Sequence, residues 1–179
     1  MTKIVGNIIL EAKNYLNEQH GDETFSNLLK KSDDEKVRET GEKSIILPTE
    51  WFELDIWKGI ITLIKKEYGP EEMHKLLDQL AQKQFKGVLG MMAKFASLDT
   101  LIENAQQSWR KFYSEGSIDI KRVDKHQIKG KISGIEMSQD LAEVLSYYLG
   151  KLAEIPSKNT IKVNLLTVTD SSADFTFHI

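Results

Sequence analysis

The chain has 179 residues, with 24 Lys and Arg against 27 Asp and Glu, 40% hydrophobic residues and no cysteine. Such a composition supports a folded core, and the lack of cysteine excludes disulfides, thiolate zinc sites, iron–sulfur clusters and cysteine nucleophiles. The net charge of -3 lacks the basic excess of nucleic-acid binders, so we expect no nucleic-acid partner. The longest apolar runs are too short to span a bilayer, and the N-terminus has no signal-peptide core. We therefore expect a cytoplasmic protein with no membrane span.

The N-terminal part of the chain has helical periodicity. Apolar residues recur at helical spacing from Ile4 to Leu16, which predicts an amphipathic helix that ends at Gly21. A second helix is expected to open at Asp22. The polar stretch 32–44 predicts a loop or a short exposed helix.

The middle of the chain predicts an extended segment and then several helices. Residues 45–52 combine an apolar run, a proline and two large aromatics, a pattern that favours extended backbone. A strong amphipathic helix is predicted over 54–68, and Pro70 suits the first turn of the next helix. Two glycines interrupt the apolar stretch 87–95. A further helix, capped at Ser97 or Asp99, is predicted to run to Tyr113.

The apolar period changes from helical to alternating after Gly116. Alternation over 118–123 and 128–135 predicts a hairpin whose turn is wider than two residues. A helix capped at Ser138 and closed by Pro156 is predicted next, followed by two strands around 170–172.

These elements together predict an α+β fold. The N-terminal multi-helix region, 1–116, is expected to pack with a C-terminal ββαββ antiparallel sheet in the region 117–179. We find no repeat and no long linker, so the sequence predicts one domain over 1–179.

No catalytic constellation is visible in the sequence. There is no Gly-x-Ser-x-Gly elbow, and the stretch 129–134 lacks the spacing and the following helix of a phosphate loop. Glu71 and His74 have a spacing that metal-binding bundles use in pairs, but the second pair is missing. We interpret them as a dipole-complementing first turn and an exposed histidine. The sequence therefore predicts no metal site and no enzyme; an enzyme resting on Glu71, Glu72 and His74 is the least favoured alternative.

Large aromatic and methionine side chains are frequent in the helical part. Most such side chains pack in a core, and that is the simplest interpretation here. A core rich in them can also leave an apolar cavity, because methionine is deformable. For such a ligand pocket the candidate lining residues are Trp51, Phe52, Phe95 and Trp109.

The order of several short motifs resembles the haem-NO-binding superfamily. Two motifs lie near the N-terminus: residues 5–10, and residues 15–25, in which a helix is followed by a Gly-acidic-acidic turn and an aromatic residue. Further along the chain are the helix break at 68–70 and the segment Phe95-Ala96-Ser97-Leu98-Asp99. The terminal ββαββ layout is similar as well. That superfamily includes the 4-vinyl reductase domains and the transport-particle (TRAPP) subunits, and the segment 109–116 is more similar to the vinyl-reductase branch. The resemblance covers most of the chain and implies a binding or sensing role.

The chain departs from the haem-binding members of this superfamily at the cofactor site. When the sequences are aligned on Ser97-Leu98-Asp99, Ile102 stands about where the resemblance places the proximal histidine. The propionate-binding Tyr-x-Ser-x-Arg motif is absent, as are the C-terminal cysteines of vinyl-reductase-like members, near one of which Phe175 lies. An iron-bound haem needs an axial ligand. The resemblance therefore implies a haem-less member, for which we expect no cofactor.

Two functions follow from this interpretation. The first is a non-catalytic sensory or regulatory domain that binds a small apolar ligand. The second is a homodimeric assembly or protein-interaction module resembling the transport-particle subunits. The N-terminal helix and the helix that contains Trp57 are the expected contact faces of such a module.

Overall fold

A computed structural model describes residues 1–88 and 97–179 of the chain, with side chains described except at 85–88. The chain forms two compact units, Met1–Leu76 and Leu77–Ile179. Their boundary falls inside a helix, not at the change from helices to strands near Gly116. The expected apolar stretch with Gly90 and Phe95 lies outside the described residues.

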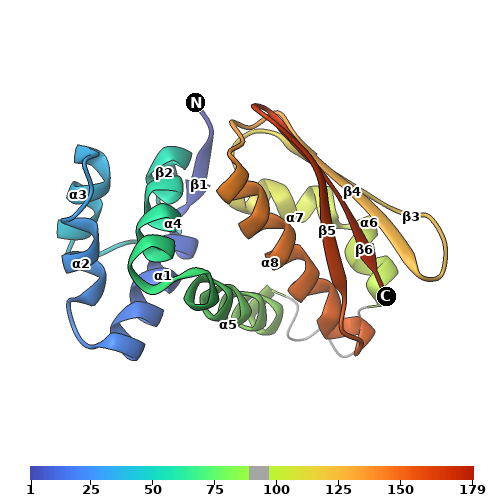
Figure 1. The fold of residues 1–179 in the computed structure, drawn as a ribbon, viewed down its shortest axis with the longest axis horizontal. Coiled ribbons are helices and arrows are strands. Elements are labelled where there is room, and N and C mark those ends of the chain that lie inside the picture. Colours follow the sequence, from blue (N-terminus) through green and yellow to red (C-terminus); the bar gives the residue numbers. More distant parts are fainter. Residues whose placement is uncertain (89–96) are drawn as a thin grey trace. The chain divides into compact units, whose positions relative to one another are not determined.

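The first unit contains helices and a small two-stranded sheet (Figure 1). In chain order its elements are β1 (Lys3–Val5), α1 (Gly6–His20), α2 (Thr24–Leu29), α3 (Glu35–Glu42), β2 (Trp51–Glu53), α4 (Leu54–Tyr68) and the first turns of α5 (Pro70–Val88). The polar stretch 32–44 thus holds a short helix, one of the two expected outcomes. Asp34 caps this helix, because its side chain accepts from the amides of Lys36 and Val37.

The first helix begins later than the apolar spacing predicted. Residues Lys3–Val5 form β1, which pairs antiparallel with β2 and places Ile4 opposite Phe52. The Gly6 amide then donates to the Glu50 carbonyl at 2.6 Å, and a Cβ on Gly6 would lie 2.4 Å from the Leu47 carbonyl oxygen. Pairing with a strand far along the chain overrides the local helical pattern here.

Helix α4 supplies much of the core of the first unit. Its inward residues are fully buried, as the spacing predicted: Trp57, Ile60, Ile61 and Ile64. Burying each such side chain stabilises the fold by about 1.5–3 kcal/mol. Gly59 allows α3 to approach, since a Cβ there would lie 2.8 Å from Cγ2 of Val37.

The second unit contains the main sheet (Figure 1). After the end of α5 come α6 (Leu98–Glu103), α7 (Ala105–Phe112), β3 (Ser117–Arg122), β4 (Gln127–Ser133), α8 (Gln139–Ser157), β5 (Lys162–Thr169) and β6 (Ser172–His178). The strands are antiparallel in the order β3-β4-β6-β5. The α+β class and the ββαββ order are confirmed, as is a hairpin turn wider than two residues between β3 and β4.

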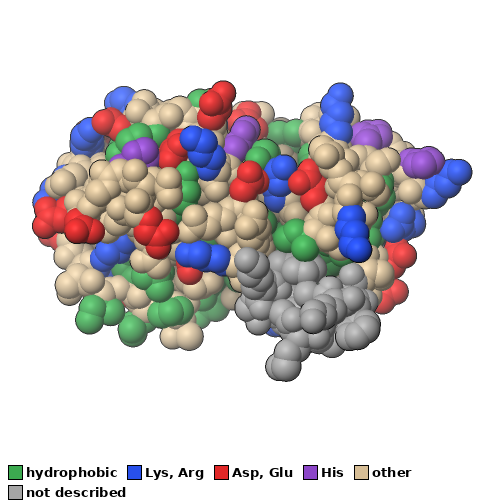
Figure 2. Space-filling view, turned by 90° about the horizontal axis from the view of Figure 1, so that it is seen from below, with side chains coloured by type: hydrophobic (Ala, Val, Ile, Leu, Met, Phe, Trp, Pro, Cys, Tyr) green, Lys and Arg blue, Asp and Glu red, His purple; other side chains and the backbone are tan. Residues whose placement is uncertain are grey.

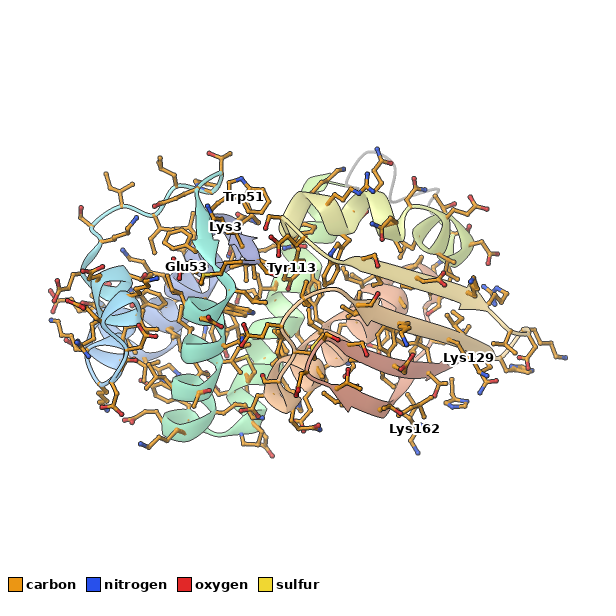
Figure 3. The ribbon with its side chains drawn as sticks, turned by 90° about the horizontal axis from the view of Figure 1, so that it is seen from above. Lys3, Trp51, Glu53, Tyr113, Lys129 and Lys162 are labelled. Atoms are coloured by element: carbon orange, nitrogen blue, oxygen red, sulfur yellow. The ribbon has the colours of Figure 1, made fainter. Side chains whose placement is uncertain are left out.

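The inner face of this sheet forms an apolar core with α8. Ile128 and Ile132 of β4 lie opposite Phe177 and Ala173 of β6, and all four are buried. The polar residues that alternate with them form the outer face, where Figure 3 labels Lys129 and Lys162. Helix α8 meets β5 closely at Gly150, where a Cβ would lie 2.4 Å from Cγ2 of Val163.

Two helix boundaries differ in detail from the sequence prediction. The helix expected up to Tyr113 is divided into α6 and α7 at Asn104, whose side-chain amide donates to the Thr100 carbonyl at 2.8 Å. Ser97 caps α6 by accepting from the Thr100 amide, one of the two caps expected. Pro156 lies inside α8, which continues to Ser157. Within the described residues, no helix is both long and apolar enough to cross a bilayer.

The contact between Gly130 and Phe175 gives a test of the sheet core. A Cβ on Gly130 would lie 2.1 Å from Cε2 of Phe175, a side chain that is only 1% exposed. We expect Gly130→Ala to lower the free energy of unfolding by about 1–3 kcal/mol through overpacking. Urea denaturation measures the change. Lys129→Ala, on the outer face of the same strand, is the matched control, and equal stability of the two variants would contradict this packing.

Candidate ligand site

Aromatic side chains from α7 and its C-terminal end form a buried wall in the second unit. The rings of Trp109 and Tyr113 stack with centroids 4.0 Å apart, and the Trp109 Nε1 donates to the Glu115 carbonyl at 3.0 Å. Both side chains are buried, and Tyr113 is labelled in Figure 3. One apolar face of the indole is therefore covered by Tyr113, and its polar atom is already satisfied.

Two adjacent tyrosines of α8 extend this site toward α5. The Tyr147 hydroxyl donates to Oδ1 of Asp78 at 3.1 Å, and the Tyr148 hydroxyl hydrogen-bonds Oε1 of Gln84. Asp78 and Gln84 both belong to the part of α5 that lies in the second unit. The two bonds tie α8 to α5.

The phenols at this site stay protonated at neutral pH. Burial raises the pKa of Tyr113, and burial followed by the proximity of Tyr113 raises the pKa of Tyr148. The pKa of Tyr147 is raised by burial first and then by the negative charge of Asp78. A phenol whose pKa moves further above 7 is a weak proton donor at neutral pH, and its phenolate, the form that could accept a proton, is scarcely populated. The site thus offers neutral hydroxyls and apolar surface rather than acid–base chemistry.

The four aromatic residues expected to line a pocket have different environments. Trp109 is buried in the second unit. Phe52 is buried in the first unit, where Lys43 Nζ lies 4.9 Å from its ring centroid. Trp51 is its neighbour on β2 and is 43% exposed. Phe95 lies outside the described residues. Because successive strand residues point to opposite faces, Trp51 and Phe52 do not share one surface.

None of the four histidines lies on α6 or α7, where Ile102 is half-buried. His74, His126 and His178 are exposed, and His20 lies at the end of α1. In the described parts of the chain, no three His, Asp or Glu residues converge into a group that could hold a metal ion. Glu71 is exposed like His74, so this pair is on the surface.

The sequence reasoning missed a buried polar cluster in the first unit, centred on Glu72. Oε1 of Glu72 accepts from the Tyr15 hydroxyl at 2.8 Å and lies 2.9 Å from Nε2 of His20. Its Oε2 accepts from Lys75 Nζ at 3.2 Å, and the His20 ring stacks on Tyr68 at 4.5 Å. The one sequence signal for this cluster is the helical spacing of Tyr15, which places its side chain on the buried face of α1. No sequence motif links Tyr15 and His20 to Glu72, because more than 50 residues separate them. The cluster joins the start of α5 to α1.

The pKa of the Glu72 carboxyl reflects two opposed effects. Burial raises it, and the hydrogen bonds from Tyr15, His20 and Lys75 lower it. The bonds outweigh burial, so the pKa lies below its ordinary value of 4.5. Glu72 is therefore an ionised, fully partnered carboxylate that anchors a helix.

Comparison with known proteins identifies the fold. No family model and no curated protein matches the sequence. The H-NOX protein from K. algicida in its Fe(II) unliganded state matches with a TM-score of 0.70 and 9% identity, over 98% of this chain and 96% of that one. An oxygen-binding H-NOX domain related to soluble guanylate cyclases matches with a TM-score of 0.63 and 16% identity, over 98% and 94%. The chain therefore has the H-NOX fold.

Replacing Glu72 tests the buried cluster. Because the pKa of Glu72 is lowered on folding, its stabilising effect is present above pH 4.5 and is lost as the pH falls through the folded-state pKa. We expect Glu72→Gln to lower the free energy of unfolding at neutral pH by about 1–3 kcal/mol. The difference from wild type should shrink in acid.

The measurement is urea denaturation as a function of pH. Glu71→Gln, on the exposed side of the same helical turn, is the matched control and should leave stability unchanged within about 0.5 kcal/mol. If the two variants behave alike at neutral pH, the cluster does not anchor α5.

Proposed function

We propose that the protein is a non-catalytic sensory domain that binds a small apolar ligand and does not hold a histidine-ligated haem. The observation that carries this proposal is that α6 and α7 contain no histidine that could bind a haem iron. Ile102, which the sequence alignment places near the proximal-histidine position, offers a hydrocarbon side chain, and residues 97–112 contain no histidine. Iron in a haem needs an axial donor.

The remaining donors do not replace that histidine. His20 is engaged with Glu72 and Tyr68 at the end of α1, and the other three histidines are at the surface. Tyr113 lies at the end of α7, but burial raises the pKa of its phenol, which disfavours the phenolate that iron would need. Among the residues that the structure describes, these histidines and this phenol therefore do not favour a haem iron at α6 and α7.

The same region suits a neutral apolar ligand. Trp109 offers a buried ring held by its own hydrogen bond, and the phenols of Tyr113 and Tyr148 are protonated. Ligand pockets typically combine such apolar walls with a few polar groups. Of the candidate lining residues, Trp109 is the one that lies in this cluster; Trp51, Phe52 and Phe95 remain candidates on sequence grounds.

Native mass spectrometry of protein purified from its own host tests ligand binding. The proposal expects a stoichiometric added mass that is neither haem nor a metal ion. Trp109→Leu should reduce the occupied fraction, while Leu166→Ser, at an exposed leucine of β5 outside the candidate site, serves as the control. A wild-type spectrum that shows only the bare chain contradicts a tightly held ligand.

A second function, assembly as a homodimer, is supported by a different observation. Exposed apolar side chains gather in one short segment of the first unit: Ile45, Leu47 and Trp51. Contiguous exposed apolar surface often marks an interaction site. Such assembly is compatible with ligand sensing.

Titration with ferric haem tests the proposed lack of haem coordination. We expect only a broad, non-saturating absorbance increase, as for haem that partitions onto apolar surfaces. Ile102→Ala should behave like wild type, because Ile102 is no ligand. Saturation at one haem per chain with a sharp Soret band in the wild-type protein would overturn the proposal, and a haem protein of the same fold is the positive control.

A further inference from the structure

The outer face of the main sheet carries two rows of polar side chains that contain no carboxylate. Strand pairing aligns one row across all four strands: Lys121, Lys129, Thr176 and Asn164. The next row is made of Gln127, His178 and Lys162. We call these seven residues the cationic rows, because their charged members are lysines. In the space-filling view, Lys, Arg and His side chains gather at the right-hand end, which carries the turn between β3 and β4 (Figure 2).

A neighbouring row on the same face has compensated charges. Lys131 lies opposite Asp119 on β3 and Asp174 on β6, and its Nζ is 3.5 Å from Oδ2 of Asp174. The Lys121 Nζ also donates to Asp119, at 2.8 Å. Within the described residues, by contrast, neither Lys129 nor Lys162 makes an ion pair, and both are exposed.

The outer face therefore has an excess of positive charge. Its strand residues include four lysines and two aspartates, a net charge of +2 with histidine neutral, whereas the whole chain has a net charge of -3. The unpaired part of this charge lies in the cationic rows, at Lys129 and Lys162, which Figure 3 labels. An anionic partner would meet an attractive surface there.

The position of Lys129 is not explained by protection of a sheet edge. Lysines on edge strands discourage unwanted strand pairing, which accounts for Lys121 on β3 and Lys162 on β5. Strand β4 is an inner strand, so Lys129 has no edge to protect. It lies directly opposite Lys121, and like charges opposite each other destabilise a sheet. A negatively charged group over these two lysines would offset that repulsion.

The composition of the face favours carboxylates of a protein over other polyanions. Single-stranded nucleic acid is bound by stacking bases on exposed rings, and Phe175 and Phe177, the aromatic residues of these strands, are buried. Lipid-binding clusters contain about four to eight Lys and Arg, and the cationic rows contain only three lysines. Four strands span roughly 14 Å, about the length of four extended residues. An acidic peptide segment therefore matches the face in charge and length.

We propose that the cationic rows dock an acidic segment of a partner protein, whose carboxylate oxygens accept from the Nζ atoms of Lys129 and Lys162. Exposed ion pairs are individually weak and are screened by salt, so the contact is transient. The surface belongs to the second unit alone. The inference goes beyond ligand sensing and holds whichever ligand the domain binds.

Fluorescence anisotropy of a short labelled peptide, in which Glu alternates with Gly, tests this inference with the full chain at low salt. The same peptide with Gln in place of Glu should not bind. Lys129→Ala and Lys162→Ala should each weaken binding about two- to fivefold. Lys129→Glu should weaken it about tenfold or more, because repulsion replaces attraction. Lys30→Ala, at an exposed lysine of the first unit, removes the same charge and should bind like wild type.

Salt and competing anions complete the test. Binding should weaken as the ionic strength rises from about 0.05 M to about 0.5 M. Equal binding of the Glu and Gln peptides, equal effects of Lys129→Ala and Lys30→Ala, or binding that salt leaves unchanged would each overturn the inference. Tighter binding to a thymidine oligonucleotide, or to vesicles of phosphatidylserine and phosphatidylcholine, would also overturn it, because the occupant would then be another class of anion.

Urea denaturation verifies that each variant is folded. Native mass spectrometry and haem titration report ligand and haem binding separately, so a failure of peptide binding leaves the sensory function untouched.

Discussion

The buried carboxylate of Glu72 is the interaction on which the arrangement of the first unit depends. Its two oxygens receive hydrogen bonds from Tyr15 and Lys75 and approach His20, so the first turn of α5 is fastened to α1. An ionised carboxylate this deeply buried persists only with such partners. Helix α5 then continues into the second unit, where Asp78 and Gln84 bond the tyrosines of α8.

The fold and the side chains of the candidate site answer different questions: the fold shows which proteins this chain resembles, and the side chains limit what it can bind. The fold matches two H-NOX structures over 98% of this chain, with TM-scores of 0.63 and 0.70, at only 16% and 9% identity. A fold of this kind constrains where apolar residues must lie, and many sequences satisfy it. The fold does not determine which side chains on α6 and α7 could bind a metal ion. In this chain, α6 and α7 carry Ile102 and Trp109, and the protonated Tyr113 follows α7. The likeness in fold therefore does not by itself determine which cofactor or ligand this chain binds.

The two surfaces proposed for function have different physical origins. The site around Trp109 is buried, and its polar atoms are satisfied internally, so it favours a neutral ligand. In the segment 45–51, Ile45, Leu47 and Trp51 are exposed, and the amides of Gly6 and Asn7 hold its backbone. A core is built from buried side chains, and a contact face is built from exposed ones. The neighbouring residues Phe52 and Trp51 therefore differ in role: Phe52 packs in the core and Trp51 faces solvent.

Much of the fold was determined by the sequence itself. Helical spacing located α4, serine caps marked the starts of α6 and α8, and alternation located the four main strands, because these signals act between residues close in the chain. That residues 97–112 contain no histidine was equally visible. Only the tertiary structure decided that Lys3–Val5 is a strand, that Glu72 rather than Glu71 is the partner of a histidine, and that Trp51 is exposed while Phe52 is buried. Each of these depends on contacts between segments tens of residues apart, and local periodicity contains no information about such partners.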